Sequence, residues 1–193
     1  METHSRVYDS YAQAERAVKD LQTAGVPYSD ISLVANRHVS EKYANVEENS
    51  PTATGAGVGA ALGGGAGLLA GVGLLAIPGL GPVVAVGWLA STALGLVAGS
   101  AAGGIVGALV GAGTSEADAH VYSEAVRRGG TLLTVRTEQP RDKIEAILNG
   151  HKPIDPASRG EEYRKSGWTQ FDPAAPDYRP DQAEIERMRR PYK

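Results

Sequence analysis

The sequence predicts an α+β fold in which a small β-α-β and α-β-α domain is split by a long helical hairpin and followed by an extended C-terminal tail. Three observations predict it. The chain from Asn49 to Ser115 contains no Asp, Glu, Lys, Arg or His; small residues recur there at every fourth position; and strand and helix patterns lie on both sides. The expected divisions are 1–48 (first half of the domain with a linker), 49–115 (uncharged hairpin), 116–150 (second half) and 151–193 (Pro-rich tail with a short terminal helix).

The first half of the domain reads as strand, helix, strand. Ser10 with Gln13 forms a capping-box pattern, and Gly25 ends the helix that follows. The expected elements are a strand at Arg6–Tyr8, a helix from Ser10 to about Ala24 and a strand at Ile31–Ala35.

The second half reads as helix, strand, helix. Ser115 is the expected N-cap of a helix with acidic residues in its first turn, and Pro140 begins a second helix that runs to Gly150. Between them, Thr131–Arg136 is rich in residues that favour strands. Neither half has enough apolar surface to fold alone, so we expect both to close into one ferredoxin-like α+β domain.

The uncharged block is predicted to be a glycine zipper. Its arms, Gly55–Ile77 and Val83–Gly113, are separated by a Pro-Gly-rich turn. Small residues every fourth position let two helices approach almost to backbone contact. The expected helix-packing and oligomer residues are Gly55, Gly59, Gly63, Gly67 and Gly71 in the first arm and Gly87, Ser91, Gly95, Gly99, Gly103, Gly107 and Gly111 in the second.

The sequence allows two environments for this hairpin, a lipid bilayer or a soluble assembly. As helices the arms would rise about 35 Å and about 46 Å, enough for a bilayer core of about 30 Å. The leading expectation is therefore a homo-oligomer with its hairpin in the lipid bilayer of the inner membrane, or otherwise membrane-associated, with both termini cytoplasmic because every Lys and Arg lies outside the hairpin. The alternative is a soluble, cytoplasmic assembly, a particle or shell in which hairpins pack on one another; a pore-forming element is a further alternative.

Several function classes are disfavoured. The chain has no cysteine, its four histidines fall in separate segments, and no nucleophile or phosphate-loop motif follows its glycines. A net charge of -3 gives no overall attraction to nucleic acid. We therefore expect a non-enzymatic protein with no catalytic, metal or cofactor residues, no cofactor, no nucleic-acid partner and no evident small-molecule substrate.

Two further features suggest contacts. Trp168 and Phe171 stand in an otherwise polar tail and are the expected tail anchor, which would dock on this or a neighbouring subunit; a disordered tail is the alternative. Arg127 and Arg128 precede a Gly-Gly pair and are expected to complement the carboxyl end of a helix, with anionic lipid as a second use. A short helix is expected at Asp181–Arg190.

Four stretches together resemble a known family. They are VYDSYAQAERAVKDLQTAGVPYSDISLVA near the N-terminus, AIPGLGPVVAVG in the uncharged block, VRRGGTLLTVR after it and SGWTQFDPAAPDY in the tail. Their combination resembles the bacterial general stress proteins of the 17M-like type, also seen in low-temperature-induced proteins, across nearly the whole chain. The resemblance implies a stress-associated protein of this architecture and carries over no catalytic residue.

Overall fold

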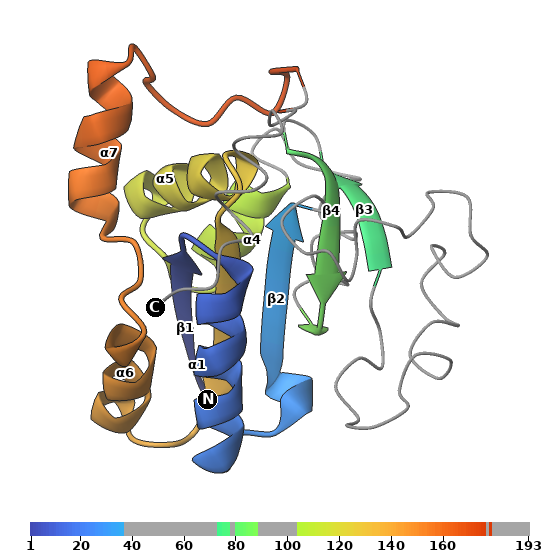
Figure 1. Cartoon of the computed structure of the whole chain (residues 1–193), viewed down its shortest axis with the longest axis vertical. Coiled ribbons are helices and arrows are strands. Elements are labelled where there is room, and N and C mark those ends of the chain that lie inside the picture. Colours follow the sequence, from blue (N-terminus) through green and yellow to red (C-terminus); the bar gives the residue numbers. More distant parts are fainter. Residues whose placement is uncertain (37–72, 78–79, 89–103, 177, 179–193) are drawn as a thin grey trace.

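The computed structural model describes residues 1–36, 73–77, 80–88, 104–176 and 178 as an α+β fold, an antiparallel sheet with helices on both faces (Figure 1). This confirms the α+β class expected from the sequence. In chain order the elements are β1 (Glu2–Tyr8), α1 (Tyr11–Thr23), a 3-10 turn (Tyr28–Asp30), β2 (Ile31–Asn36), β3 (Gly73–Ile77), β4 (Gly81–Val86), α4 (Ile105–Gly111), α5 (Glu116–Arg127), β5 (Thr131–Thr137), α6 (Arg141–Gly150) and α7 (Pro156–Lys165).

Local capping explains why the helices begin where the sequence predicts. The Ser10 hydroxyl accepts from the Gln13 amide at 3.3 Å and donates to the Gln13 side-chain oxygen at 3.0 Å. Ser115 caps α5 in the same way by accepting from the Asp118 amide at 3.2 Å. Each cap satisfies an amide that the first turn of the helix leaves without a partner.

β5 lies between β1 and β2 in the sheet and is antiparallel to both. Leu132 faces Val7 on one side and Val34 on the other. As a result β1 and β2 run parallel to each other with β5 inserted between them, and α1 connects them. The two halves of the domain, far apart in sequence, are therefore joined through one sheet.

The two faces of this sheet carry different helices. Because side chains alternate along a strand, Leu132 points to one face and its neighbour Leu133 to the other. One face packs with α1 and α6 in a cluster that includes Tyr8, Leu21, Leu133, Ile144 and Leu148. The other face packs with α4, α5 and α7 in a second cluster, here called the α5 cluster: Val7, Val34, Leu80, Val83, Ile105, Val106, Ala108, Leu109, Ala119, Val121, Tyr122, Ala125, Val126, Leu132, Ile154, Tyr163 and Phe171.

This arrangement differs from the ferredoxin-like one that the sequence suggested. In an α+β fold of that kind the helices gather on one face of the sheet, whereas α1 and α5 here cover opposite faces. The strand order is β1-β5-β2-β4-β3. The physical reason is that β5 has buried apolar side chains on both faces, Leu132 on one and Leu133 with Val135 on the other, so each face must be covered.

The expectation of an extended tail is wrong for Pro156–Lys165, which form helix α7. Asp155 caps it by accepting from the Ser158 amide at 2.9 Å, and Pro156 occupies the first turn, where a missing amide costs nothing. Just before it, the Ile154 amide donates to the Val7 carbonyl at 2.7 Å and so fixes this segment to β1. The short helix expected at Asp181–Arg190 lies outside the described residues.

The expectation of a helical hairpin is wrong at Gly73–Ile77 and Gly81–Val86, which are strands. β3 and β4 are antiparallel strands, and β4 pairs with β2 from Leu33↔Val86 to Asn36↔Val83. The β-branched residues of Gly81–Val86 favour a strand, and the sheet offers that strand an edge to pair with. α4 is helical as expected, whereas most of both arms lies outside the described residues.

Candidate functional site

Most of the glycine series lies outside the described residues, which hold three of its members. The positions outside are Gly55, Gly59, Gly63, Gly67, Gly71, Ser91, Gly95, Gly99 and Gly103. Gly87, Gly107 and Gly111 are described, and each has a different environment.

Gly87 follows β4 at a close approach of two backbones. Its φ is +90°, a conformation that residues with a side chain rarely adopt. A Cβ at this position would lie 2.2 Å from the Ile31 carbonyl oxygen and 2.9 Å from the Ser32 Cα. Glycine is therefore required here by the pairing of β4 with β2, which is a different reason from the helix seam expected at this position.

In α4 the bulky residues make the helix contact. Ile105 and Leu109 are buried in the α5 cluster, whereas Gly107 is half-buried and Gly111 is exposed. Val110 is 43% exposed, and no described atom lies within 4 Å of a Cβ built at Gly111. Gly111 therefore lies on the exposed side of α4.

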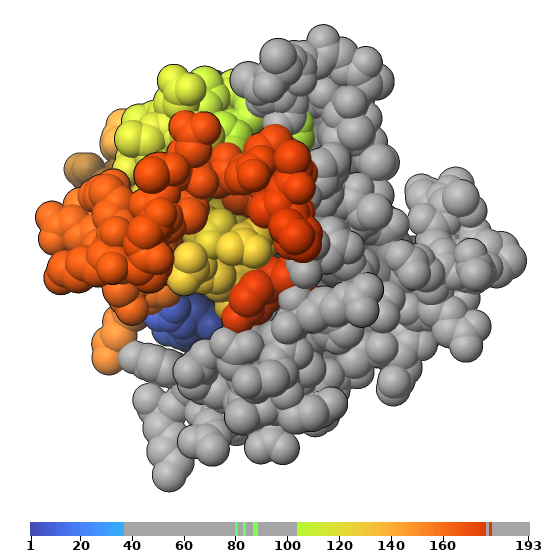
Figure 2. Space-filling view, turned by 90° about the horizontal axis from the view of Figure 1, so that it is seen from above, coloured from blue at the N-terminus to red at the C-terminus, as the bar shows by residue number. Residues whose placement is uncertain are grey.

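The expected tail anchor lies on the α5 cluster of the same chain. Phe171 is 4% exposed and belongs to that cluster, and Trp168 packs against it half-buried. The Trp168 ring meets the Tyr163 ring edge-on, with centroids 5.6 Å apart and planes at 70°. Figure 2 shows the C-terminal segment, in orange-red, lying against the yellow residues of α5.

A charged network at the carboxyl end of α5 receives this tail. The Glu124 side chain is 2% exposed and accepts from Arg127 Nε at 2.9 Å, from Arg127 Nη2 at 2.8 Å and from Arg128 Nε at 2.6 Å. These hydrogen bonds to Glu124 raise the pKa of Arg127 above its usual value, against the effect of burial. A carboxylate buried between two guanidinium groups is stabilised by charge-assisted hydrogen bonds on both sides.

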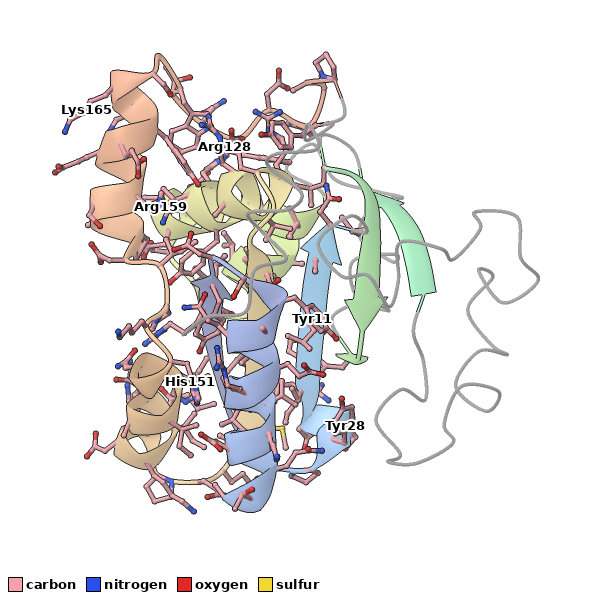
Figure 3. The ribbon with its side chains drawn as sticks, viewed as in Figure 1. Tyr11, Tyr28, Arg128, His151, Arg159 and Lys165 are labelled. Carbon is pink, nitrogen blue, oxygen red and sulfur yellow. The ribbon has the colours of Figure 1, made fainter. Side chains whose placement is uncertain are left out.

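The two arginines also contact aromatic rings from the C-terminal part of the chain. The Arg128 guanidinium carbon lies 4.3 Å from the centroid of Tyr163, and that of Arg127 lies 5.5 Å from the centroid of Tyr178. In Figure 3 Arg128 is labelled beside the upper end of α7. We call these residues the arginine–aromatic cluster: Glu124, Arg127, Arg128, Tyr163, Trp168 and Tyr178.

This cluster holds the C-terminal segment at the end of α5. Each guanidinium group contacts one ring and hydrogen-bonds to Glu124, and the Arg128 side chain stays 34% exposed. The anionic-lipid contact considered from the sequence stays a prediction. Sequence reasoning missed the role of Glu124. The signal was its spacing of three and four residues from the two arginines, which places all three on one helix face.

A second polar cluster lies between β1 and α6. His4 is 4% exposed, with Nε2 3.9 Å from Glu2 Oε2 and Nδ1 3.9 Å from Glu145 Oε1. Arg141 bridges the same two carboxylates at 2.8 Å each. Burial lowers the pKa of His4 despite the two carboxylates, and Arg141 and Arg6 add to the lowering. This cluster fixes the N-terminal strand to α6.

A third contact ties α6 to α1 on the same face. His151 Nε2 lies 2.9 Å from Asp20 Oδ2, and Figure 3 labels His151 between these helices. Among the described residues, no set of three or more His, Cys, Asp or Glu side chains is grouped to hold a metal ion.

Within the described ranges, no helix combines the length and the apolar character needed to cross a bilayer. Comparisons of this chain with protein-family models, with curated proteins and with solved structures found no match.

Proposed function

We propose that this protein is a non-enzymatic, stress-associated scaffold that forms homo-oligomers through its uncharged glycine-rich block. The observation that carries the proposal is the attachment of the block to the α+β domain at two points. In the middle of the block β4 pairs with β2, and near its C-terminal end α4 buries Ile105 and Leu109 in the α5 cluster. A block attached at two points to a folded domain is presented to other molecules from a fixed base.

Energetics support an association through the glycines. Glycine in a helix costs about 1 kcal/mol relative to alanine, so the five or six glycines of each series would cost roughly 5 kcal/mol as helices. Close approach of two backbones offsets this cost through dispersion contacts along the seam. A contiguous exposed apolar patch larger than a few hundred Å² normally marks an interface. A second copy of the same block would supply a matching helix face that is lined by glycines.

The strands shorten the arms of the proposed zipper. Outside β3, β4 and α4, the series spans residues 55–72 and 89–103. As helices these stretches would rise about 27 Å and about 22 Å. A bilayer core is about 30 Å thick. The shorter arms favour packing between copies over a complete crossing.

Membrane insertion is the second candidate, and one observation favours it. No charged residue or histidine lies between Asn49 and Ser115, and all 19 Lys and Arg lie outside that block. An inserted block would therefore leave both termini on the cytoplasmic side. Alkaline carbonate extraction of expressing cells separates the candidates: release as a large particle supports the soluble assembly, and retention in the pellet supports insertion.

Paired substitutions in the glycine series test the proposal itself. Leucine at both Gly99 and Gly103 adds bulk along the proposed seam, so we expect a smaller particle by light scattering in detergent-free buffer. Ala102→Leu adds the same side chain outside the four-residue series and is the matched control. A Gly99→Leu, Gly103→Leu chain with the mass of the parent would contradict a glycine seam.

A further inference from the structure

The chain reverses direction directly after α7. Gly167 has a φ of +87°, its amide donates to the Arg164 carbonyl at 3.0 Å, and the Trp168 amide donates to the Tyr163 carbonyl at 3.2 Å. This is the usual way in which a glycine ends a helix and redirects the chain. No described atom would lie within 4 Å of a Cβ at Gly167. The described residues of the segment that follows, residues 166–176 and Tyr178, are here called the strap.

The strap is held at two places and exposed between them. Trp168 and Phe171 form the first attachment, on Tyr163 and in the α5 cluster. Tyr178 forms the second, against the Arg127 guanidinium. Between them Asp172 closes a local turn by accepting from the Ala174 amide at 2.8 Å. A segment with few attachments and exposed backbone opens at a lower free energy than the core does.

The strap packs in the same apolar cluster as the two segments of the uncharged block that attach to the domain, one in its middle and one near its C-terminal end. Phe171 belongs to the same apolar cluster as Leu80, Val83, Ile105 and Leu109, and Trp88 packs against that cluster as Trp168 does. Figure 1 shows the strap leaving the upper end of α7 and crossing above α5 toward the upper end of β4, where that strand begins. Lifting the strap would therefore uncover apolar side chains at the base of the block.

The charged network beneath the strap does not depend on it. Glu124, Arg127 and Arg128 all belong to α5 or its cap, and they bind one another without any strap residue. If the strap were lifted, Arg127 would lose its contact with the Tyr178 ring, whereas the ring beside Arg128 is Tyr163 of α7. Both arginines would keep their hydrogen bonds to Glu124. The strap can therefore bind to this network or leave it while Glu124 stays paired with both arginines, so no buried charge loses its partner.

We propose that the strap restrains self-association by covering the apolar base of the uncharged block, and that its release opens this base to a second copy of the chain. This inference rests on the proposed function, because it assigns a regulator to the same association. A second copy is the fitting occupant since the uncovered side chains are uncharged and continuous with a block that has no charge to repel its own copy.

A full-length double variant, Trp168→Ser with Phe171→Ser, tests the inference. Removing both rings detaches the first attachment, so hydrogen exchange in Ile105–Gly111 should rise about tenfold or more. The concentration at half-association, measured by sedimentation, should fall about tenfold. Gln170→Ser, an exposed strap position, is the matched control and should behave as the parent does in both measurements.

The contrary outcomes differ for the two proposals. Unchanged or weaker association of the double variant, while hydrogen exchange in α4 rises, overturns the restraint and leaves the scaffold intact. Monomers at every concentration for parent and variants overturn the scaffold, and the restraint with it. If the double variant fails to fold by circular dichroism, Tyr178→Ala detaches only the second attachment and is judged by the same two measurements.

Discussion

The carboxylate of Glu124 binds the guanidinium of Arg127 through two hydrogen bonds, from Nε to Oε2 at 2.9 Å and from Nη2 to Oε1 at 2.8 Å. Arg128 donates to the same carboxylate from the next position. One buried side chain therefore fixes two cations at the end of α5, where the C-terminal rings lie on them. The contacts of these arginines with Tyr163 and Tyr178 link the end of α5 to α7 and to the tail.

We expect Glu124→Gln to destabilise the fold by about 2 kcal/mol, because it leaves two partly buried guanidinium groups without their counter-charge. Urea unfolding followed by circular dichroism measures the loss. Glu161→Gln, at an exposed position of α7, is the control and should change stability by less than about 0.5 kcal/mol. Equal stability of the two variants would show that Glu124 has no such role.

Substitution by alanine should lower the stability of the fold at Gly87 and raise it at Gly111. Gly87→Ala forces a Cβ to within 2.2 Å of the Ile31 carbonyl at a φ of +90°, so we expect a loss of about 2 kcal/mol or more. Gly111→Ala meets no described atom within 4 Å in a helix and should stabilise by about 0.5 kcal/mol or more. Thermal unfolding distinguishes them. If both substitutions are mild, β4 does not approach β2 as described.

Helix α7 approaches α5 closely at a glycine outside the series. A Cβ at Gly160 would lie 3.1 Å from Val121 Cγ2, whereas one at Gly150, the last residue of α6, meets nothing within 4 Å. Gly160→Leu should therefore cost about 1–3 kcal/mol through overpacking. Gly150→Leu is the matched control and should not destabilise. A tolerated leucine at Gly160 would mean that α7 does not pack on α5.

His4 should make stability fall in mild acid. Burial holds the pKa of its imidazole below the usual value of about 6.5, so the folded state binds this proton less readily than the unfolded state. The contribution is complete above about pH 6.5 and is lost as pH falls below it. His4→Gln should therefore show a smaller drop in melting temperature than the parent between neutral pH and about pH 5. Parallel pH profiles of parent and variant would contradict this.

Caps and breakers made the flanking elements predictable. Ser10 and Ser115 begin helices where the sequence places them, and Pro140 immediately precedes α6. These signals act within a few residues of one another, so they can be read without knowing the tertiary structure. The same holds for Asp155 followed by Pro156, a start signal whose helix sequence reasoning missed because α7 buries only Gly160 and Tyr163.

The features that were not predicted depend on distant residues. The run Thr131–Val135 contains apolar side chains on both faces, a pattern typical of a strand buried on both sides, which fits the two-sided covering of β5. Which helix covers which face cannot be read from either half alone. Likewise, a short apolar run such as Gly73–Ile77 suits a helix or a strand equally, and the choice of strand came from pairing with β4. Glu124 meets Tyr163 and Tyr178 through Arg127 and Arg128 only once the tail has folded back.

Sedimentation velocity of the purified full-length chain, in aqueous buffer without detergent and over a range of concentrations, tests the central claim most directly. The account predicts particles several times heavier than the 20.1 kDa chain, reduced in size by leucine at Gly99 and Gly103. A monodisperse 20.1 kDa species at every concentration, identical for parent and leucine variant, would contradict it.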